Sequence, residues 1–152
     1  MLTVVMGAPC SGKTTYIDQH ANTGDIIIDL DRMALAMTTS DIAHHDYPDA
    51  VRWVAVAARR AAIESAFTYH HDGASVWIID TMPDRARRQQ YHKHNADMIT
   101  LDPGRDVCLA RAMQHRPAYA LDVIDKWYGE TSRGRPSAGT PTPTPVVSSR
   151  RW

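Results

Sequence analysis

The feature that most constrains this chain is a short segment near its start, Gly7-Ala8-Pro9-Cys10-Ser11-Gly12-Lys13-Thr14. The segment matches the phosphate-binding pattern G-x-x-x-x-G-K-[ST] at every position. An apolar run precedes it and a helix-forming stretch follows it, which is the context that such a loop requires. The glycines allow the backbone to approach a phosphate closely, and the amides that open the helix can surround the phosphate oxygens.

This pattern predicts a site for ATP with Mg²⁺. Lys13 is expected to contact the β- and γ-phosphates during the reaction, and the Thr14 hydroxyl to ligate Mg²⁺. The residues predicted to bind the nucleotide are Gly7, Ala8, Pro9, Cys10, Ser11, Gly12, Lys13, Thr14 and Thr15.

Apolar runs that favour strands alternate with helical segments along the first 130 residues. The predicted strands are residues 2–6, 25–29, 75–79 and 98–101, and the predicted helices include 13–22, 84–95, 105–115 and 119–128. In a further helix, one apolar face is predicted to hold Val51, Val54, Ala58 and Ala62, and the opposite face Arg52, Arg59, Arg60 and Glu64. Buried strands separated by helices indicate a small doubly wound α/β domain, with a parallel sheet of four or five strands and helices on both faces.

The last part of the chain differs in composition. Residues 131–152 are rich in Pro, Thr and Ser and carry a net charge of +4, which leaves residues 1–130 at −4. We therefore expect a folded domain over 1–130 and a disordered basic tail over 131–152. No stretch approaches the roughly 20 apolar residues of a membrane span, and no leader is evident at the start. A cytoplasmic protein is expected, with no membrane partner.

Acidic residues follow two of the predicted strands. Asp29 and Asp31 close the second strand, where a carboxylate can accept the proton of an attacking hydroxyl. Asp31 is the preferred candidate for this role, and the alternative is that one of the pair caps the next helix. Asp80 ends the run Val76–Ile79 and is predicted to reach Mg²⁺. Arg111 and Arg116, late in the domain, are predicted to cover the phosphates during transfer.

Several segments in this order resemble a known family: GAPCSGKTT, then Asp31, IIDTMPDRARRQQYH, CLARAMQHRP and AYALDVIDKWY. Together they resemble the polynucleotide 5′-kinase domain of phage end-healing enzymes over nearly all of residues 2–128. The resemblance implies that Asp31 is the general base, Asp80 the acid after the third strand, and Arg111 and Arg116 the lid arginines. If the chain is phage-encoded, the expected location is the host cytoplasm.

The chain departs from that family at two positions. Ala34 stands where the family has an arginine that contacts the acceptor's phosphate, and His115 stands where the second lid arginine is expected, with Arg116 next to it. The acceptor therefore stays open. It can be the 5′-hydroxyl of a polynucleotide, a hydroxymethylpyrimidine within DNA as in related small phage kinases, or a nucleoside or other small molecule. A nucleotide-binding regulatory or hydrolytic module without an acceptor is the remaining alternative.

Two further groups of residues are expected to have structural rather than functional roles. The eight histidines include the pairs His44-His45 and His70-His71. Because adjacent residues on a helix point apart and no cysteine lies nearby, we expect no metal site among them. A basic helix after Asp80, with Arg85, Arg87, Arg88 and Lys93, is expected to be a solvated face, with contact to a nucleic-acid backbone as the alternative.

Overall fold

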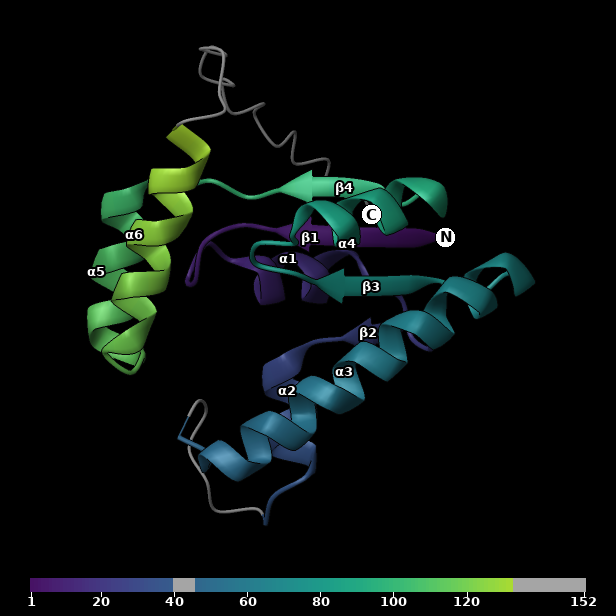
Figure 1. Ribbon diagram of the computed structural model, residues 1–152, viewed down its shortest axis with the longest axis horizontal. Helices are drawn as coiled ribbons and strands as arrows, with labels where there is room; N and C mark the ends of the chain where they lie inside the picture. The colour runs from purple at the N-terminus through teal and green to yellow at the C-terminus, as the bar shows by residue number, and fades with distance from the viewer. Residues whose placement is uncertain (40–45, 133–152) are drawn as a thin grey trace, which may run out of the picture.

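The computed structural model describes residues 1–39 and 46–132. Within them, four parallel strands form one sheet in the order β2-β3-β1-β4, with bounds Ile26–Ile28, Val76–Ile79, Leu2–Met6 and Asp97–Thr100 (Figure 1). The central strand β1 pairs on one side with β3, where Val4 lies opposite Ile78, and on the other with β4, where Val4 lies opposite Met98. Since all the strands run the same way, their carboxyl ends meet at one edge of the sheet.

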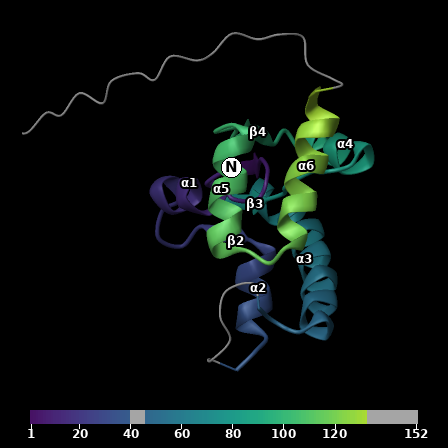
Figure 2. The ribbon, with the colours of Figure 1, turned by 90° about the vertical axis from the view of Figure 1, so that its left-hand side faces the viewer.

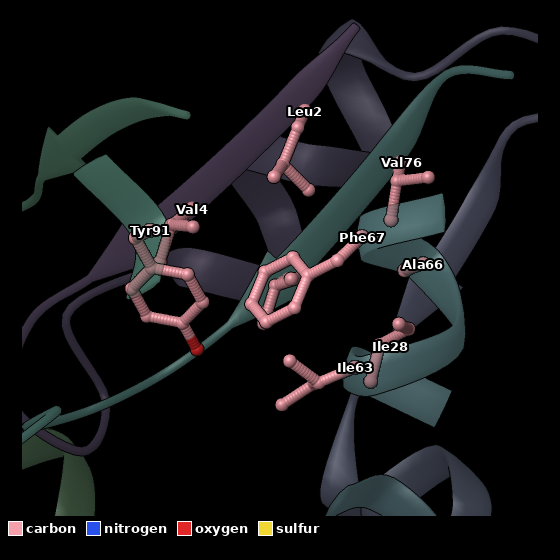
Figure 3. Packing of buried hydrophobic residues seen from close by; sticks show 9 residues of the cluster. Leu2, Val4, Ile28, Ile63, Ala66, Phe67, Val76 and Tyr91 are labelled. Carbon is pink, nitrogen blue, oxygen red and sulfur yellow. The ribbon is translucent and has the colours of Figure 1, made fainter. Parts of the chain in front are cut away.

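Helices cover both faces of this sheet. On one face lie α3 (Asp49–Tyr69) and α4 (Arg85–Lys93), and on the other lies α1 (Lys13–His20). The first core is a cluster that joins α3 and α4 to the strands, with the Phe67 and Tyr91 rings at its centre (Figure 3). A second, smaller cluster packs Ile17 of α1 against Val5 and Trp77. The predicted doubly wound α/β fold is therefore confirmed, with four strands and six α-helices in the described ranges.

The last two helices lie at the end of the sheet rather than on a face. α5 (Arg105–His115) and α6 (Tyr119–Ser132) pack against each other beyond the strand arrowheads, and Figure 2 views the molecule from this end. Their shared cluster contains Cys108, Ala112, Ile124 and Trp127 and reaches the phosphate loop through Ala8. The pair is therefore placed to cover the carboxyl edge, where ligands of parallel α/β folds bind.

The face that the sequence predicted for α3 is wrong in part. Val54 is 59% exposed, whereas Ala55, Ile63, Ala66 and Phe67 form the buried side. Arg59, which was predicted to point to solvent, is only partly exposed and turns toward the end of β3. The alanine-rich sequence of α3 explains the error, because small residues fit both faces of a helix and leave the apolar stripe poorly defined.

Two further expectations concern the tail and the membrane. α6 extends through Ser132, so the first two residues of the tail expected over 131–152 are helical, and 133–152 lie outside the described residues. In the part of the chain that the structure describes, no helix is both long enough and apolar enough to cross a bilayer.

Candidate active site

The phosphate loop joins β1 to α1 and leaves the start of that helix uncapped. Gly12 caps the helix with φ 97° and has no side chain to accept a hydrogen bond from the first turn of α1, which also holds no acid. The first amides of a helix lack intrahelical partners and carry its positive dipole end. The loop thus offers these donors to an anion.

Gly7 fits this loop to the neighbouring strand. Its φ is 145°, and a Cβ at this position would lie 2.4 Å from the Leu101 carbonyl oxygen and 2.5 Å from Ser11 Oγ. The loop therefore passes the end of β4 at a distance that only glycine allows.

Lys13 is a buried cation held by carbonyl groups. Its Nζ donates to the Gly7 oxygen at 2.8 Å and to the Ala8 oxygen at 2.7 Å. Burial, followed by the charge of Arg116, lowers the pKa of Lys13 from 10.5 to about 8. Within residues 1–39 and 46–132, no carboxylate forms an ion pair with this amine.

The residues of the loop fit a phosphate-bearing ligand. A buried ammonium group without a carboxylate is stabilised when an anion binds beside it. Ser11 Oγ is buried behind the cleft wall and has no hydrogen-bond partner in the described part of the chain, so a shift of the loop on binding would be needed to bring it to a ligand. Thr14 is exposed and lines the cleft in front of the loop, where its hydroxyl is available to a Mg²⁺ ion.

The two acids after β2 have different positions from those predicted. The strand ends at Ile28, so Asp31 does not close it but lies in the first turn of α2 (Leu30–Ala36). Asp29 takes the capping position, and its Oδ1 accepts a hydrogen bond from the Asp31 amide at 3.1 Å. Burial, and then the charge of Asp31, raises the pKa of Asp29. One acid of the pair therefore caps the helix, as the alternative interpretation held.

Asp31 faces the cleft from the first turn of α2, and the capping acid Asp29 lines the same cleft. The Tyr47 hydroxyl donates to its Oδ1 at 2.6 Å, and Arg116 Nη1 donates to its Oδ2 at 3.3 Å. Burial and the contact with Asp31 raise the pKa of Tyr47, so this phenol stays a donor.

Asp80 lies at the carboxyl end of β3. It accepts a hydrogen bond from the Tyr91 hydroxyl at 2.7 Å and lies 3.6 Å from Arg59 Nη2. The same arginine donates to the Ile79 carbonyl oxygen, which fixes its position beside the strand end. Burial and the negative charge of Asp80 raise the pKa of Tyr91. Asp80 thus reaches the cleft already paired with a cation and a phenol.

The two predicted lid arginines contact different parts of the cleft wall. Arg111, on α5, donates to the Cys10 carbonyl oxygen of the phosphate loop at 3.1 Å. Arg116 follows the end of α5 and reaches Asp31 on α2. His115 also lines the cleft. The end of α5 therefore bridges the nucleotide loop and the acid that was predicted to act as base.

These groups line one cleft of about 1250 Å³ at the carboxyl edge of the sheet. The predicted site residues on its wall are Pro9, Cys10, Gly12, Lys13, Thr14, Thr15, Asp31, Asp80, Arg111 and Arg116, while Gly7, Ala8 and Ser11 lie behind it. Sequence reasoning missed two residues, Arg59 and Tyr47. The sequence of α3 does not show which of its faces is buried, so Arg59 could not be placed in the cleft. Tyr47 precedes that helix in a segment without hydrophobic periodicity, which gives no indication of its position.

Such a loop, between the first strand and helix of a parallel sheet with an acid ending the adjacent strand, defines a P-loop nucleotide-binding domain. Comparison with protein families agrees: the chain belongs to the AAA domain family AAA_33, whose model matches residues 2–119. This is a P-loop NTPase-like kinase family that includes polynucleotide-kinase-like members. No curated protein matches the chain.

Proposed function

We propose that this protein is an ATP-dependent kinase that transfers the γ-phosphate to a hydroxyl group of a nucleic acid. The acceptor would be a 5′-hydroxyl end or a hydroxymethylpyrimidine within DNA. The observation that carries the proposal is the position of Asp31. Its carboxylate faces the same cleft as the phosphate loop and is oriented by Tyr47 and Arg116. A purely regulatory nucleotide-binding module has no need of an oriented carboxylate in the cleft, and the transfer assay below separates a kinase from a hydrolytic module, in which Asp31 would act on water.

The roles of the residues follow from their places in the cleft. Lys13 and the loop amides would hold the phosphates, and Thr14 with Asp80 would hold Mg²⁺, which supplies positive charge to the phosphate oxygens when bound. Asp31 would accept the proton of the acceptor hydroxyl. Arg111 and Arg116 would stabilise the charge that develops during transfer.

Arg59 is proposed to replace the arginine that the related kinases have at the position of Ala34. Ala34 is fully buried on α2, so a side chain there cannot reach the cleft without disturbing the packing between α2 and α3. Arg59 arrives at the cleft from α3 instead, and its guanidinium lies beside Asp80. A phosphate or hydroxyl of the acceptor would meet this cation on the side of the cleft away from α5.

A second hollow supports a polynucleotide over a free nucleoside. It has a volume of about 670 Å³ and begins at Met82, directly after Thr81, which lines the main cleft. Its basic lining residues are Arg85, Arg88, His92 and Lys126, and its one acid is Asp84. Cationic side chains in such a position neutralise backbone phosphates. The predicted alternative for the basic helix, contact with nucleic acid, is therefore the one we propose.

Transfer of labelled γ-phosphate tests the reaction and the acceptor together. The acceptors are 5′-hydroxyl DNA, 5′-hydroxyl RNA, hydroxymethylpyrimidine DNA and free nucleosides, each with ATP and Mg²⁺. Product on a polynucleotide is expected. Product on nucleosides alone would make this a nucleoside kinase, and ATP hydrolysis without product on any acceptor would favour the hydrolytic module.

Two matched substitutions test the base. Asp31→Asn keeps the shape and the contact with Tyr47 but removes the proton acceptor, so kcat should fall by roughly 10²–10⁴-fold while ATP affinity is retained. Asp29→Asn is the control, because an amide oxygen still caps α2 and the buried charge is removed. Equal losses in the two variants would contradict the assignment of Asp31.

The basic hollow is tested by comparing acceptors of different length. Arg85→Ala should raise KM for a polynucleotide and lower its dependence on salt, with no change for a dinucleotide acceptor. Arg60→Ala is the control, because Arg60 is exposed on α3 and lines neither hollow. A KM that is unchanged by Arg85→Ala would remove the support for a long acceptor.

A further inference from the structure

Three histidines meet at the edge of the sheet opposite the candidate active site. His70 and His71 begin the 3-10 turn η1 (His70–Asp72), which leads into β3, and His94 ends α4, just before β4. One ring nitrogen from each of the three lies within 4.8 Å of the others. In Figure 1 the strand arrows point away from this edge, so the histidines lie at the amino ends of β3 and β4.

The expectation that adjacent histidines point apart is wrong for this pair. His70 caps α3 and opens the 3-10 turn, and its ring lies beside that of His71, with centroids 3.8 Å apart. The His94 centroid lies 5.7 Å from that of His70 and 5.8 Å from that of His71. The other adjacent pair, His44 and His45, lies outside the described residues.

The core holds His94 in place. Its ring stacks on Phe67 with a centroid distance of 4.3 Å and an interplanar angle of 1°. Phe67 is itself buried and meets Tyr91 edge to face at 6.0 Å, and Figure 3 shows the two rings side by side in the main cluster. One ring of the cluster is therefore positioned by packing before any ligand arrives.

A backbone contact fixes the tautomer of His70. Its Nδ1 lies 3.1 Å from the Ala66 carbonyl oxygen. A carbonyl can only accept, so Nδ1 carries the proton and Nε2 keeps its lone pair. Metal-binding histidines are commonly oriented in this way, with the second ring nitrogen donating to a carbonyl.

We propose that His70, His71 and His94 form a binding site for a divalent transition-metal ion of the zinc class, with one coordination position left to water. Imidazole nitrogens suit Zn²⁺, Cu²⁺ and Ni²⁺, whereas Mg²⁺ and Ca²⁺ select oxygen ligands. Bonds of about 2.0–2.1 Å in a tetrahedral site place ligand nitrogens about 3.3 Å apart, so the rings need to approach by about 1.5 Å at most. His71 is exposed and can rotate to make this approach.

The bound ion would add a coordinate link between two loops that already meet through ring contacts. One loop joins α3 to β3 and the other joins α4 to β4, and both enter the sheet at its amino edge. The site lies apart from the cleft at the carboxyl edge, so its effect would be on stability rather than on transfer. At a free metal concentration of 100 times the Kd, the melting temperature should rise by about 5–10 °C.

Metal titration of the full-length chain without an affinity tag tests the proposal. After removal of bound metal with a chelator, Zn²⁺ is titrated by calorimetry and Co²⁺ by visible absorption, which reports tetrahedral coordination. One equivalent is expected to bind, with excess Mg²⁺ or ATP·Mg²⁺ leaving the signal unchanged. Absence of stoichiometric binding, or displacement of Co²⁺ by ATP·Mg²⁺, would overturn the proposal.

Single substitutions locate the ion. His71→Gln and His94→Gln should each weaken Zn²⁺ binding by 10-fold or more and remove the rise in melting temperature. His20→Gln is the control, since His20 lies at the end of α1, outside the cluster. His71 is exposed, so its variant is expected to fold even if that of His94 does not. Binding by His71→Gln with the affinity of the parent would assign the ion to other ligands and contradict the site.

Discussion

Lys13 is a cation that the fold prepares for an anion. Among residues 1–39 and 46–132 its amine donates only to carbonyl groups of the loop, and burial with the charge of Arg116 lowers its pKa to about 8. A phosphate beside the amine favours the charged form and raises this pKa again. The residue therefore links nucleotide binding to proton uptake.

This linkage predicts how ATP affinity depends on pH. Below pH 8 the amine is already charged in the free protein, so the affinity should change little on its account. Above pH 8 binding must also take up a proton, and the affinity should fall by up to about tenfold per pH unit. Calorimetry on either side of pH 8, at fixed Mg²⁺, measures the effect. Lys13→Met should lose both the affinity and this pH dependence, and an equally steep fall in that variant would assign it to another group.

Gly7 gives the second prediction at the scale of single residues. Gly7→Ala places a Cβ against the Leu101 carbonyl oxygen at a backbone angle that L residues avoid, and should cost about 2–3 kcal/mol. Gly129→Ala is the matched control, because a Cβ there meets nothing within 4 Å and alanine favours the helix by about 0.5–1 kcal/mol. Urea unfolding measures both. A Gly7 variant as stable as the parent would show that the loop can move away from β4.

At the scale of elements, the sequence predicted what depends on local pattern and missed what depends on packing. The strand before the phosphate loop and the helix after it were found because motif and apolar run coincide. The sequence placed Asp31 at the end of the second strand, whereas it lies in the first turn of α2. The apolar run Ile26–Ile28 does not reveal that the strand ends at Ile28 and that Asp29 caps a helix. Arg59 could not be found, because the inward face of α3 is set by contacts with distant strands.

The helix pair α5 and α6 allows buried and exposed interactions to be compared. Trp127 is buried between α6 and the segment after β3, and its indole N–H donates to the Thr81 carbonyl oxygen at 3.2 Å. Trp127→Ala should cost about 3–5 kcal/mol. The ion pair of Arg105 with Asp125 is half exposed, so Arg105→Ala should cost less than about 1 kcal/mol despite its 2.7 Å contact. Chemical denaturation compares them, and similar losses in both would contradict this ranking.

At the scale of the whole molecule, the two edges of the sheet are assigned different chemistry. The carboxyl edge carries the phosphate loop, the acids and the arginines of α5. The amino edge carries the histidine cluster, and no sequence motif predicts that these three residues lie together. The cluster could not be predicted because it joins residues 70 and 94 through the packing of α3 and α4, not through spacing along the chain.

The extent of the folded domain gives the last prediction. Residues 133–152 are rich in Pro, Thr and Ser with few large apolar side chains, so a chain ending at Ser132 should keep the melting temperature of the parent within a few degrees. A chain ending at Asp122 is the control, since it lacks the buried Ile124 and Trp127 and should unfold. Calorimetry measures the melting temperatures of the two chains. A large fall in the melting temperature of the chain that ends at Ser132 would show that the folded domain extends beyond this residue.

The contact between Arg116 and Asp31 has a kinetic consequence for the proposed kinase. Arg116 donates to the Asp31 carboxylate at 3.3 Å and, in the proposed reaction, would also cover the phosphates. An acceptor that arrives first finds its base engaged with a cation, and therefore a poor proton acceptor. An incoming nucleotide would draw the guanidinium toward its own charge and release the carboxylate. The proposed kinase should therefore bind its substrates in a compulsory order, with the nucleotide before the acceptor.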